Sequence, residues 1–317
     1  MKSPVNIIII AASLAMVSAA SCSHKDIECP DSMRRIHVLF EWDHSENTDV
    51  AGMTLYFYPL DEGGSIWRFD IAGLDGGTVE LPLGQYCLIA CNNDLPGTIL
   101  QDVNSPSTIQ AVPNFRIDAD VYGSSGMFYD AVVRNLEVTP CGVRYVTETG
   151  MVKECGGGLV RCHPDSLATQ YTVILRNVSG LDNVRSANAI LKGTRNGIYL
   201  ESHRPSDIPS ALSMKMKPNR INAVMSAQGC MFSTLNAEKA QYSLTLQVLR
   251  SDGKGLTRDI AIKPENLNCI TPHNVIISIA GIEIPDDSSP ADITGIDVGV
   301  DGWDVIDIDL EPSFENI

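Results

Sequence analysis

The chain has 317 residues, of which 44% are hydrophobic and 6% aromatic, enough apolar material for one large domain or two of ordinary size. With 20% charged residues, its composition fits neither a disordered polyelectrolyte nor a coiled coil. Its 39 acidic residues outnumber the 23 Lys and Arg, and the formal charge of -16 repels the phosphates of nucleic acids, which we therefore do not expect as partners.

The N-terminal segment has the pattern of a secretion signal. Lys2 precedes an apolar run over 7–17, and small residues follow over 18–21. About 11 apolar residues suit a signal peptide, whereas a helix that spans a bilayer needs roughly 20. A buried helix would need a polar face, and the run of isoleucines and alanines provides none. We expect residues 1–21 to be a signal peptide.

Cys22 follows these small residues as in the lipobox of bacterial lipoproteins, where the cysteine thiol is acylated and becomes the new N-terminus. Each buried methylene contributes about 0.8 kcal/mol, so several acyl chains would hold the protein permanently. We expect residues 22–34 to be a tether joined to outer-membrane lipid through acylated Cys22. Asp26 and Glu28 partly match the export signal of surface lipoproteins in Bacteroidetes, which predicts a protein that faces the cell exterior. The alternative is ordinary cleavage near Ala20, with Cys22 left free.

The other eight cysteines permit disulfides outside the cytoplasm. Cys87 and Cys91 lie four positions apart in a predicted strand, roughly 13 Å at 3.3 Å per residue, so they cannot bridge one another. We expect both to be core residues. Three further cysteines flank a glycine-rich bend, and the spacing leaves one disulfide among them open: Cys141, Cys155 and Cys162.

Alternation of apolar and polar residues dominates the first half of the chain. From Ile36 to Trp42, every second residue is apolar, which predicts a half-buried strand. Turn residues about every 8 to 12 positions separate four more candidates, a spacing typical of β-sandwiches. These candidates cover 53–58, 67–71, 78–81 and 86–91. Residues 92–116 are rich in Asn, Asp, Pro and Ser and are expected to form a long loop. The pattern predicts a first sandwich over 35–155.

A second group of strands begins at Tyr171 and predicts another sandwich over 170–317. The run of three glycines that opens 156–169 marks this stretch as the expected linker. The strands expected after it cover 171–175, 189–191, 242–249, 256–262, 274–280, 296–300 and 305–310. We therefore expect an all-β chain with two sandwich domains.

The sequence contains no motif of a known catalytic or metal site. Six histidines are scattered without paired spacing, and the GxSxG, GxxxxGK and GxGxxG patterns are all missing. Acidic residues near the C-terminus could attract calcium, which prefers carboxylate oxygens. Two of them alternate with Ile306 and Ile308, however, as on the solvated face of a strand. We expect no enzyme activity, no cofactor and no metal site. The acidic residues in question are Asp297, Asp301, Asp304, Asp307 and Asp309.

Several segments together resemble a known family. Residues 78–86 read TVELPLGQY before an apolar strand, similar to an element of transthyretin-like β-sandwiches. With WRFDI at 67–71, LDGGT at 74–78 and QYTVILRNVSGL at 170–181, the chain resembles a fimbrillin-like family of Bacteroidetes lipoproteins of unknown function, related to the FimB-type fimbrial anchor subunits. The resemblance implies two tandem transthyretin-like β-sandwich domains.

The resemblance also implies a function. We expect a non-enzymatic outer-membrane lipoprotein on the cell surface, a fimbrial anchor or accessory subunit whose partners are fimbrial subunits bound by strand exchange. The alternative is a glycan- or protein-binding surface lipoprotein unrelated to pili, because sandwich loops suit binding. Three tryptophans could stack on a sugar in that case, although each is more often a core residue: Trp42, Trp67 and Trp303.

Overall fold

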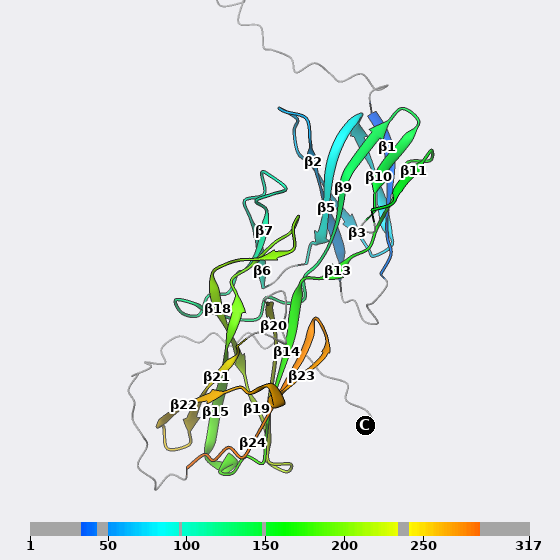
Figure 1. Ribbon diagram of the computed structural model, residues 1–317. Helices are drawn as coiled ribbons and strands as arrows, with labels where there is room; N and C mark the ends of the chain where they lie inside the picture. The colour runs from blue at the N-terminus through cyan, green and yellow to red at the C-terminus, as the bar shows by residue number, and fades with distance from the viewer. Residues whose placement is uncertain (1–32, 43–49, 95–96, 148–149, 234–240, 286–317) are drawn as a thin grey trace, which may run out of the picture.

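The computed structural model describes residues 33–42, 50–94, 97–147, 150–233 and 241–285. Over these ranges the chain forms two β lobes stacked end to end (Figure 1). The only helical turns in the described ranges are two short 3-10 helices, η2 (Leu181–Asn183) and η4 (Pro264–Asn266). The all-β sandwich fold that the alternating pattern predicts is confirmed.

The first lobe packs a three-stranded sheet against a seven-stranded one. The small sheet has the order β12-β1-β4, and the large one β11-β10-β9-β5-β2-β3, with β13 paired to β9. The strands of the small sheet are β1 (Met33–Phe40), β4 (Gly76–Pro82) and β12 (Leu159–Cys162). Those of the large sheet are β2 (Gly52–Pro59), β3 (Trp67–Ala72), β5 (Gly84–Asn92), β9 (Tyr129–Thr139), β10 (Gly142–Val146), β11 (Val152–Cys155) and β13 (Asp165–Ser166).

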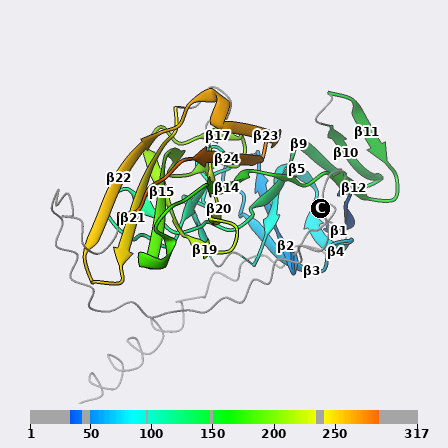
Figure 2. The ribbon, with the colours of Figure 1, turned by 90° about the horizontal axis from the view of Figure 1, so that it is seen from below.

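The second lobe contains a ten-stranded sheet. Its main order is β22-β21-β15-β20-β14-β24-β23, and β18, β19 and β8 pair with it at the side. Seen from below, β22, β21 and β15 follow one another across one side of the lobe (Figure 2). The strands are β8 (Val121–Tyr122), β14 (Ala168–Arg176), β15 (Val184–Arg195), β18 (Pro209–Lys215), β19 (Lys217–Asn219), β20 (Val224–Phe232), β21 (Ser243–Arg250), β22 (Gly255–Ala261), β23 (Leu267–Thr271) and β24 (Asn274–Ala280).

A small sheet made from both halves of the chain joins the lobes. Its order is β17-β16-β7-β6, in which β6 and β7 come from the first half and β16 and β17 from the second. Its members are β6 (Thr98–Gln101), β7 (Gln110–Pro113), β16 (Ile198–Tyr199) and β17 (Arg204–Pro205). The prediction of a long loop over 92–116 is therefore wrong where β6 and β7 form a hairpin. Strands of four residues are too short to show a period in the sequence.

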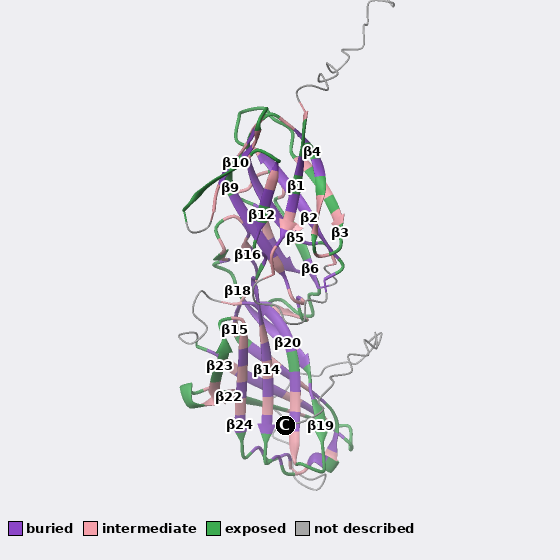
Figure 3. Ribbon diagram, turned by 90° about the vertical axis from the view of Figure 1, so that its right-hand side faces the viewer, coloured by how far each residue is buried: buried purple, intermediate pink, exposed green. Residues whose placement is uncertain are grey.

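Side-chain alternation explains why two strands of the first lobe are buried on both faces. On β2, Leu55 and Phe57 point into the core of the first lobe, whereas Tyr56 and Tyr58 belong to a separate apolar cluster at the junction. β5 divides its side chains between the same two clusters. Figure 3 shows buried residues running through the strands of both lobes. The described residues therefore form three apolar cores, one of which is shared between the lobes.

The expected linker 156–169 is partly sheet. Within it, β12 pairs in parallel with β1, and Val160 and Cys162 are buried in the first lobe. A buried strand cannot act as a free connection, because its backbone groups are hydrogen-bonded. The strands expected at 296–300 and 305–310 lie outside the described residues. The boundaries of the two sandwiches stay a prediction.

Candidate functional site

Cys22, for which the sequence predicts acylation, lies outside the described residues. The chain enters the described part at Met33, the first residue of β1. β1 is the central strand of its sheet: it pairs antiparallel with β4 over Met33–Leu39 and parallel with β12 over His37–Phe40. A segment that precedes Met33 is therefore joined directly to a strand with hydrogen bonds on both sides.

Packing rather than charge holds β1 in place. Its core face carries Ile36, Val38 and Phe40, all buried in the first lobe. Burying an apolar side chain of this size contributes about 1.5–3 kcal/mol. On the other face, Arg35 pairs with Glu80 of β4 at 3.1 Å, but both side chains are mostly exposed. Such surface pairs contribute little, about 0–1 kcal/mol.

The junction between the lobes is the second candidate site, because the third apolar core spans it. Phe128 of the first half meets Phe232 of β20 edge to face, with ring centroids 6.2 Å apart, and both side chains are fully buried. Aromatic pairs of this geometry contribute about 0.5–1.5 kcal/mol beyond their burial. A backbone hydrogen bond also crosses the junction: the Ser125 N–H donates to the Cys230 carbonyl at 2.9 Å. The junction is packed like the interior of a domain.

Two polar pairs cross the junction beside this core. Arg134 Nε of β9 donates to Glu201 Oε1 at 2.6 Å, and His203 Nε2 lies 3.1 Å from Asp130 Oδ2. The side chain of Asp130 is fully buried. Removing His203 would leave a buried carboxyl with one partner fewer, and an unsatisfied buried polar group is destabilising. Sequence reasoning missed these four residues, because partners about seventy positions apart leave no local signal.

The thiols of the buried cysteines Cys87, Cys91 and Cys230 have low reactivity. Burial raises the pKa of the Cys87 and Cys230 thiols to about 11 and raises that of Cys91 further. At neutral pH these thiols are therefore protonated. Because only the thiolate is a good nucleophile, they are unreactive. The expectation that Cys87 and Cys91 are core residues is confirmed, since both are buried in the junction core.

The disulfide that the sequence left open is not formed. Cys141 and Cys155 both carry free thiols, so no two of the three candidate cysteines are joined. Cys162 points into the core of the first lobe, whereas Cys141 is exposed at the turn before β10. Cys155 is half-buried and packs against the same core as Cys162.

The two described tryptophans pack against the core of the first lobe. The indole N–H of Trp42 donates to the Leu74 carbonyl at 2.9 Å, and its ring meets Tyr129 edge to face. Trp67 also packs against that core. Both rings are partly buried by this packing, and Trp303 lies outside the described residues.

The described part of the chain holds neither a candidate metal site nor a candidate membrane-spanning helix. There, no group of three or more His, Cys, Asp or Glu side chains is placed to hold a metal ion. The aspartates between Asp297 and Asp309 fall outside that part. In the same ranges, no helix is long and apolar enough to cross a bilayer.

One known protein family matches the sequence of this two-lobe chain. The sequence profile of a family described as a domain of unknown function, DUF5119, matches residues 21–214, which is more than half of the chain. The chain belongs to the DUF5119 family. No curated protein sequence matches this DUF5119 protein.

Solved structures share the fold of the DUF5119 chain. A candidate adhesin from Bacteroides ovatus superposes with a TM-score of 0.65 at 17% identity, covering 85% of this chain and 98% of its own. A candidate polysaccharide-binding protein from Bacteroides thetaiotaomicron gives a TM-score of 0.52 at 12% identity, covering 78% and 91%. The fimbrial anchor protein Mfa2 from Porphyromonas gingivalis reaches only 0.48 at 12% identity, covering 78% and 90%. The first two likenesses show a shared β-sandwich fold.

Proposed function

We propose that this DUF5119 protein is a non-enzymatic lipoprotein of the outer membrane, held by acylated Cys22 and facing the cell exterior, where it serves as a fimbrial anchor or accessory subunit. The observation that carries the proposal is the position of β1. The lipobox cysteine stands 11 positions before Met33, and Met33 opens a strand that is hydrogen-bonded on both sides. A lipid attached at Cys22 would be joined to the body of the protein by this short segment.

The pairing of β1 suits a subunit that bears force. A pull along β1 loads its bonds to β4 and β12 together, because both neighbours run beside it. The junction core and the pairs Arg134–Glu201 and Asp130–His203 then connect the first lobe to the second. Force applied at the far lobe would reach the tether through packed elements rather than through a loose linker.

The likeness to the candidate adhesin supports a role at the cell surface. The expected mode of assembly is strand exchange, in which the main chain of a donated strand pairs with a sheet edge. In the described part of the second lobe, β22 and β23 stand at the two ends of the sheet order. Edge strands present unpaired N–H and C=O groups, which is what such pairing requires.

Crosslinking in intact cells tests this role. We expect outer-membrane extracts of cells that make the protein to contain it joined to a polymerising fimbrial subunit. The crosslinked species should form a ladder whose steps match the mass of that subunit. Recovery of the protein as an uncrosslinked monomer, under conditions that capture known subunit contacts, would contradict the proposal.

A second candidate function is binding of a surface glycan, which the likeness to a candidate polysaccharide-binding protein favours. The packing of Trp42 and Trp67 gives it no support from the described tryptophans. Incubating the full chain with an array of bacterial and host glycans distinguishes the two. Retention of one glycan class, together with absence of any crosslinked fimbrial subunit, would favour this second function.

A further inference from the structure

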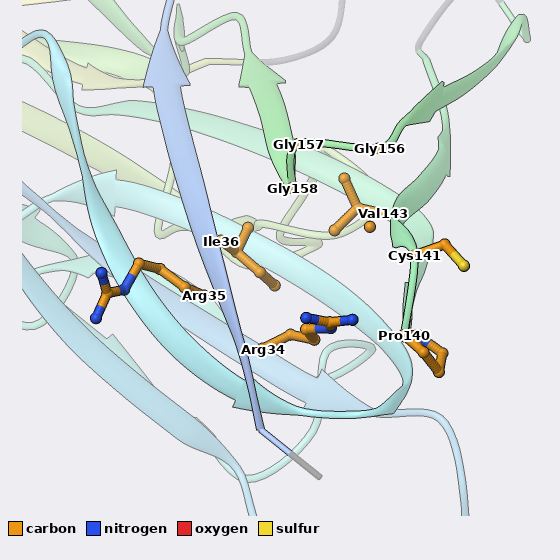
Figure 4. Close-up of a pocket in the computed structure, with 10 residues that line it drawn as sticks. Arg34, Arg35, Ile36, Pro140, Cys141, Val143, Gly156, Gly157 and Gly158 are labelled. Atoms are coloured by element: carbon orange, nitrogen blue, oxygen red, sulfur yellow. The ribbon is translucent and has the colours of Figure 1, made fainter. Parts of the chain in front are cut away.

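A hollow opens at the end of the first lobe where β1 begins (Figure 4). It has a volume of about 210 Å³. Three short segments line it: Arg34–Ile36 of β1, the turn Pro140–Val143 between β9 and β10, and the glycine turn Gly156–Gly158. The first and last of these segments lie more than a hundred positions apart in the sequence. The hollow is therefore formed by the fold, and no local sequence motif predicts it.

The strand period places one arginine at the hollow. Ile36 and Val38 fill the core face of β1, and Arg34 lies one repeat earlier on that face, where the sandwich ends. Its guanidinium lies in the space between β1 and Pro140 (Figure 4). Arg35 points to the opposite side, where it pairs with Glu80. Within the described ranges, Arg34 makes no hydrogen bond or ion pair.

The glycine turn supplies the opposite wall. The Gly158 N–H donates to the Cys155 carbonyl at 3.1 Å and closes the turn. Gly158 has a φ of +72°, and a Cβ there would lie 2.7 Å from the Arg35 carbonyl oxygen, so a side chain does not fit. At Gly157 a Cβ would meet nothing within 4 Å. At Gly157 the main chain therefore borders the hollow without a side chain over it. Backbone amides of glycine-rich turns are frequent contacts for anions.

The charge at the hollow is opposite to that of the whole protein. The formal charge of the chain is -16, yet none of the residues that line the hollow is Asp or Glu. Two carboxylates of the neighbouring strands β9 and β11 are paired with another arginine, since Arg144 lies 4.0 Å from Glu137 and 3.4 Å from Glu154. Among the described residues, Arg34 has no acidic neighbour in the lining of the hollow.

From this arrangement we infer that the hollow binds a phosphate group. Guanidinium matches phosphate oxygens with two parallel hydrogen bonds, and such charge-assisted bonds are among the strong ones. Ligand pockets for larger molecules measure about 300–1,000 Å³, so a hollow of this size suits a phosphate with few attached atoms. The exposed Arg34 faces solvent on one side, which leaves room for the rest of a ligand.

The phosphate has two candidate sources. If residues 22–34 tether the protein as proposed above, the 11 positions from Cys22 to Met33 span at most roughly 40 Å when extended, and a lipid headgroup lies within reach. Free phosphate in the medium is the other source. Only the headgroup source rests on the proposed function, because binding of free phosphate requires no anchor.

A titration of the full-length protein with inorganic phosphate, followed by calorimetry, tests the inference. We expect the variant Arg34→Gln to bind about tenfold more weakly or worse, since a lost charge-assisted hydrogen bond costs about 1.5–3 kcal/mol. The matched control is Arg68→Gln, an exposed arginine of β3 that pairs with Asp70 and does not line the hollow; it should bind within about twofold of wild type. Equal affinity in Arg34→Gln and wild type, or absence of binding to wild type, would overturn the inference.

A second variant tests whether weaker phosphate binding comes from the site itself and not from misfolding. Gly157→Asp adds a carboxylate to the lining at a position with free space and ordinary backbone conformation. It should keep the unfolding temperature of wild type and yet weaken phosphate binding by repulsion. Unchanged binding in this folded variant would also contradict the site.

Binding to lipid vesicles shows whether the phosphate is a lipid headgroup or free phosphate. The variant Cys22→Ala removes the acyl chains, and flotation then compares phosphatidylcholine vesicles with and without phosphatidic acid. Recruitment only by phosphatidic acid, lost in Arg34→Gln, would assign the site to a headgroup. Phosphate binding without recruitment would assign it to free phosphate. Retained acylation of Cys22→Ala would contradict the anchor but not the phosphate site, so the two failures are distinct.

Discussion

At the scale of single residues, burial decides the chemistry of the cysteines. Cys87 and Cys91 point from β5 into the junction core, and Cys230 reaches the same core from β20. In each case burial is the main cause of the raised pKa. The sequence predicted the first two as core residues because they lie in an apolar strand and are too far apart to bridge one another. It could not predict the partners of Asp130 or Arg134, which depend on how distant segments meet.

The raised thiol pKa values predict a loss of stability in alkali. The pKa of Cys87 rises from 9.0 to about 11 on folding, so between these pH values the unfolded chain loses a proton that the folded chain keeps. The contribution of Cys87 to the free energy of unfolding should therefore be fully present below pH 9. As pH rises through 11, the free energy of unfolding should fall by up to about 3 kcal/mol.

Urea unfolding at about pH 8 and about pH 10.5 measures this loss. Cys87→Ala should show a smaller fall between the two pH values than wild type, whatever its stability at pH 8. Cys141→Ala, which changes an exposed thiol, is the control and should fall as wild type does. An identical fall in Cys87→Ala and wild type would rule out this explanation.

At the scale of elements, the strands that show alternation in the sequence are those with one face in a lobe core. β1 and β14 are examples, with buried side chains at every second position over most of their length. The hairpin of β6 and β7 behaves differently. Its strands have four residues each, and β7 is completed by pairing Ala111 with Ile198, far along the chain. No period in 92–116 could reveal such a partner.

Phenylalanine substitutions test the junction core. Phe128→Ala should destabilise the protein by about 3–5 kcal/mol, because it leaves a cavity in a fully buried site. Phe115→Ala is the matched control, since that ring is 61% exposed, and it should stay within about 0.5 kcal/mol of wild type. Chemical denaturation of the full chain measures both. A cost below about 1 kcal/mol for Phe128→Ala would mean that the junction is not packed as described.

A double-mutant cycle shows whether the contact crosses the lobes. Phe128→Ala and Phe232→Ala should couple by about 0.5–1.5 kcal/mol, as expected for an edge-to-face aromatic pair. Strictly additive effects would indicate that the two rings do not meet in solution.

At the scale of the whole molecule, the shared core makes the lobes one mechanical unit. β2 and β5 contribute side chains to the first core and to the junction core at the same time. The alternation of the sequence predicted two sandwiches, but it also suggested a linker where β12 enters the first sheet. A glycine run indicates a break in regular structure, and here the break is a tight turn between two strands.

The shared core predicts that the lobes unfold together. Scanning calorimetry of the full chain should show one transition whose calorimetric and van't Hoff enthalpies agree. Phe128→Ala should lower the temperature of that transition and, if the junction is the coupling element, broaden or divide it. Two well-separated transitions in wild type would contradict a shared core.

Metabolic labelling with a clickable palmitate analogue shows whether the protein is fixed to the outer membrane through Cys22, as we propose. In cells that make the protein, wild type should carry the label and sediment with outer membranes. Cys22→Ala should carry none and leave the membrane fraction. Label on the Cys22→Ala variant, or unlabelled wild-type protein in the cytosol at its full length, would contradict the account.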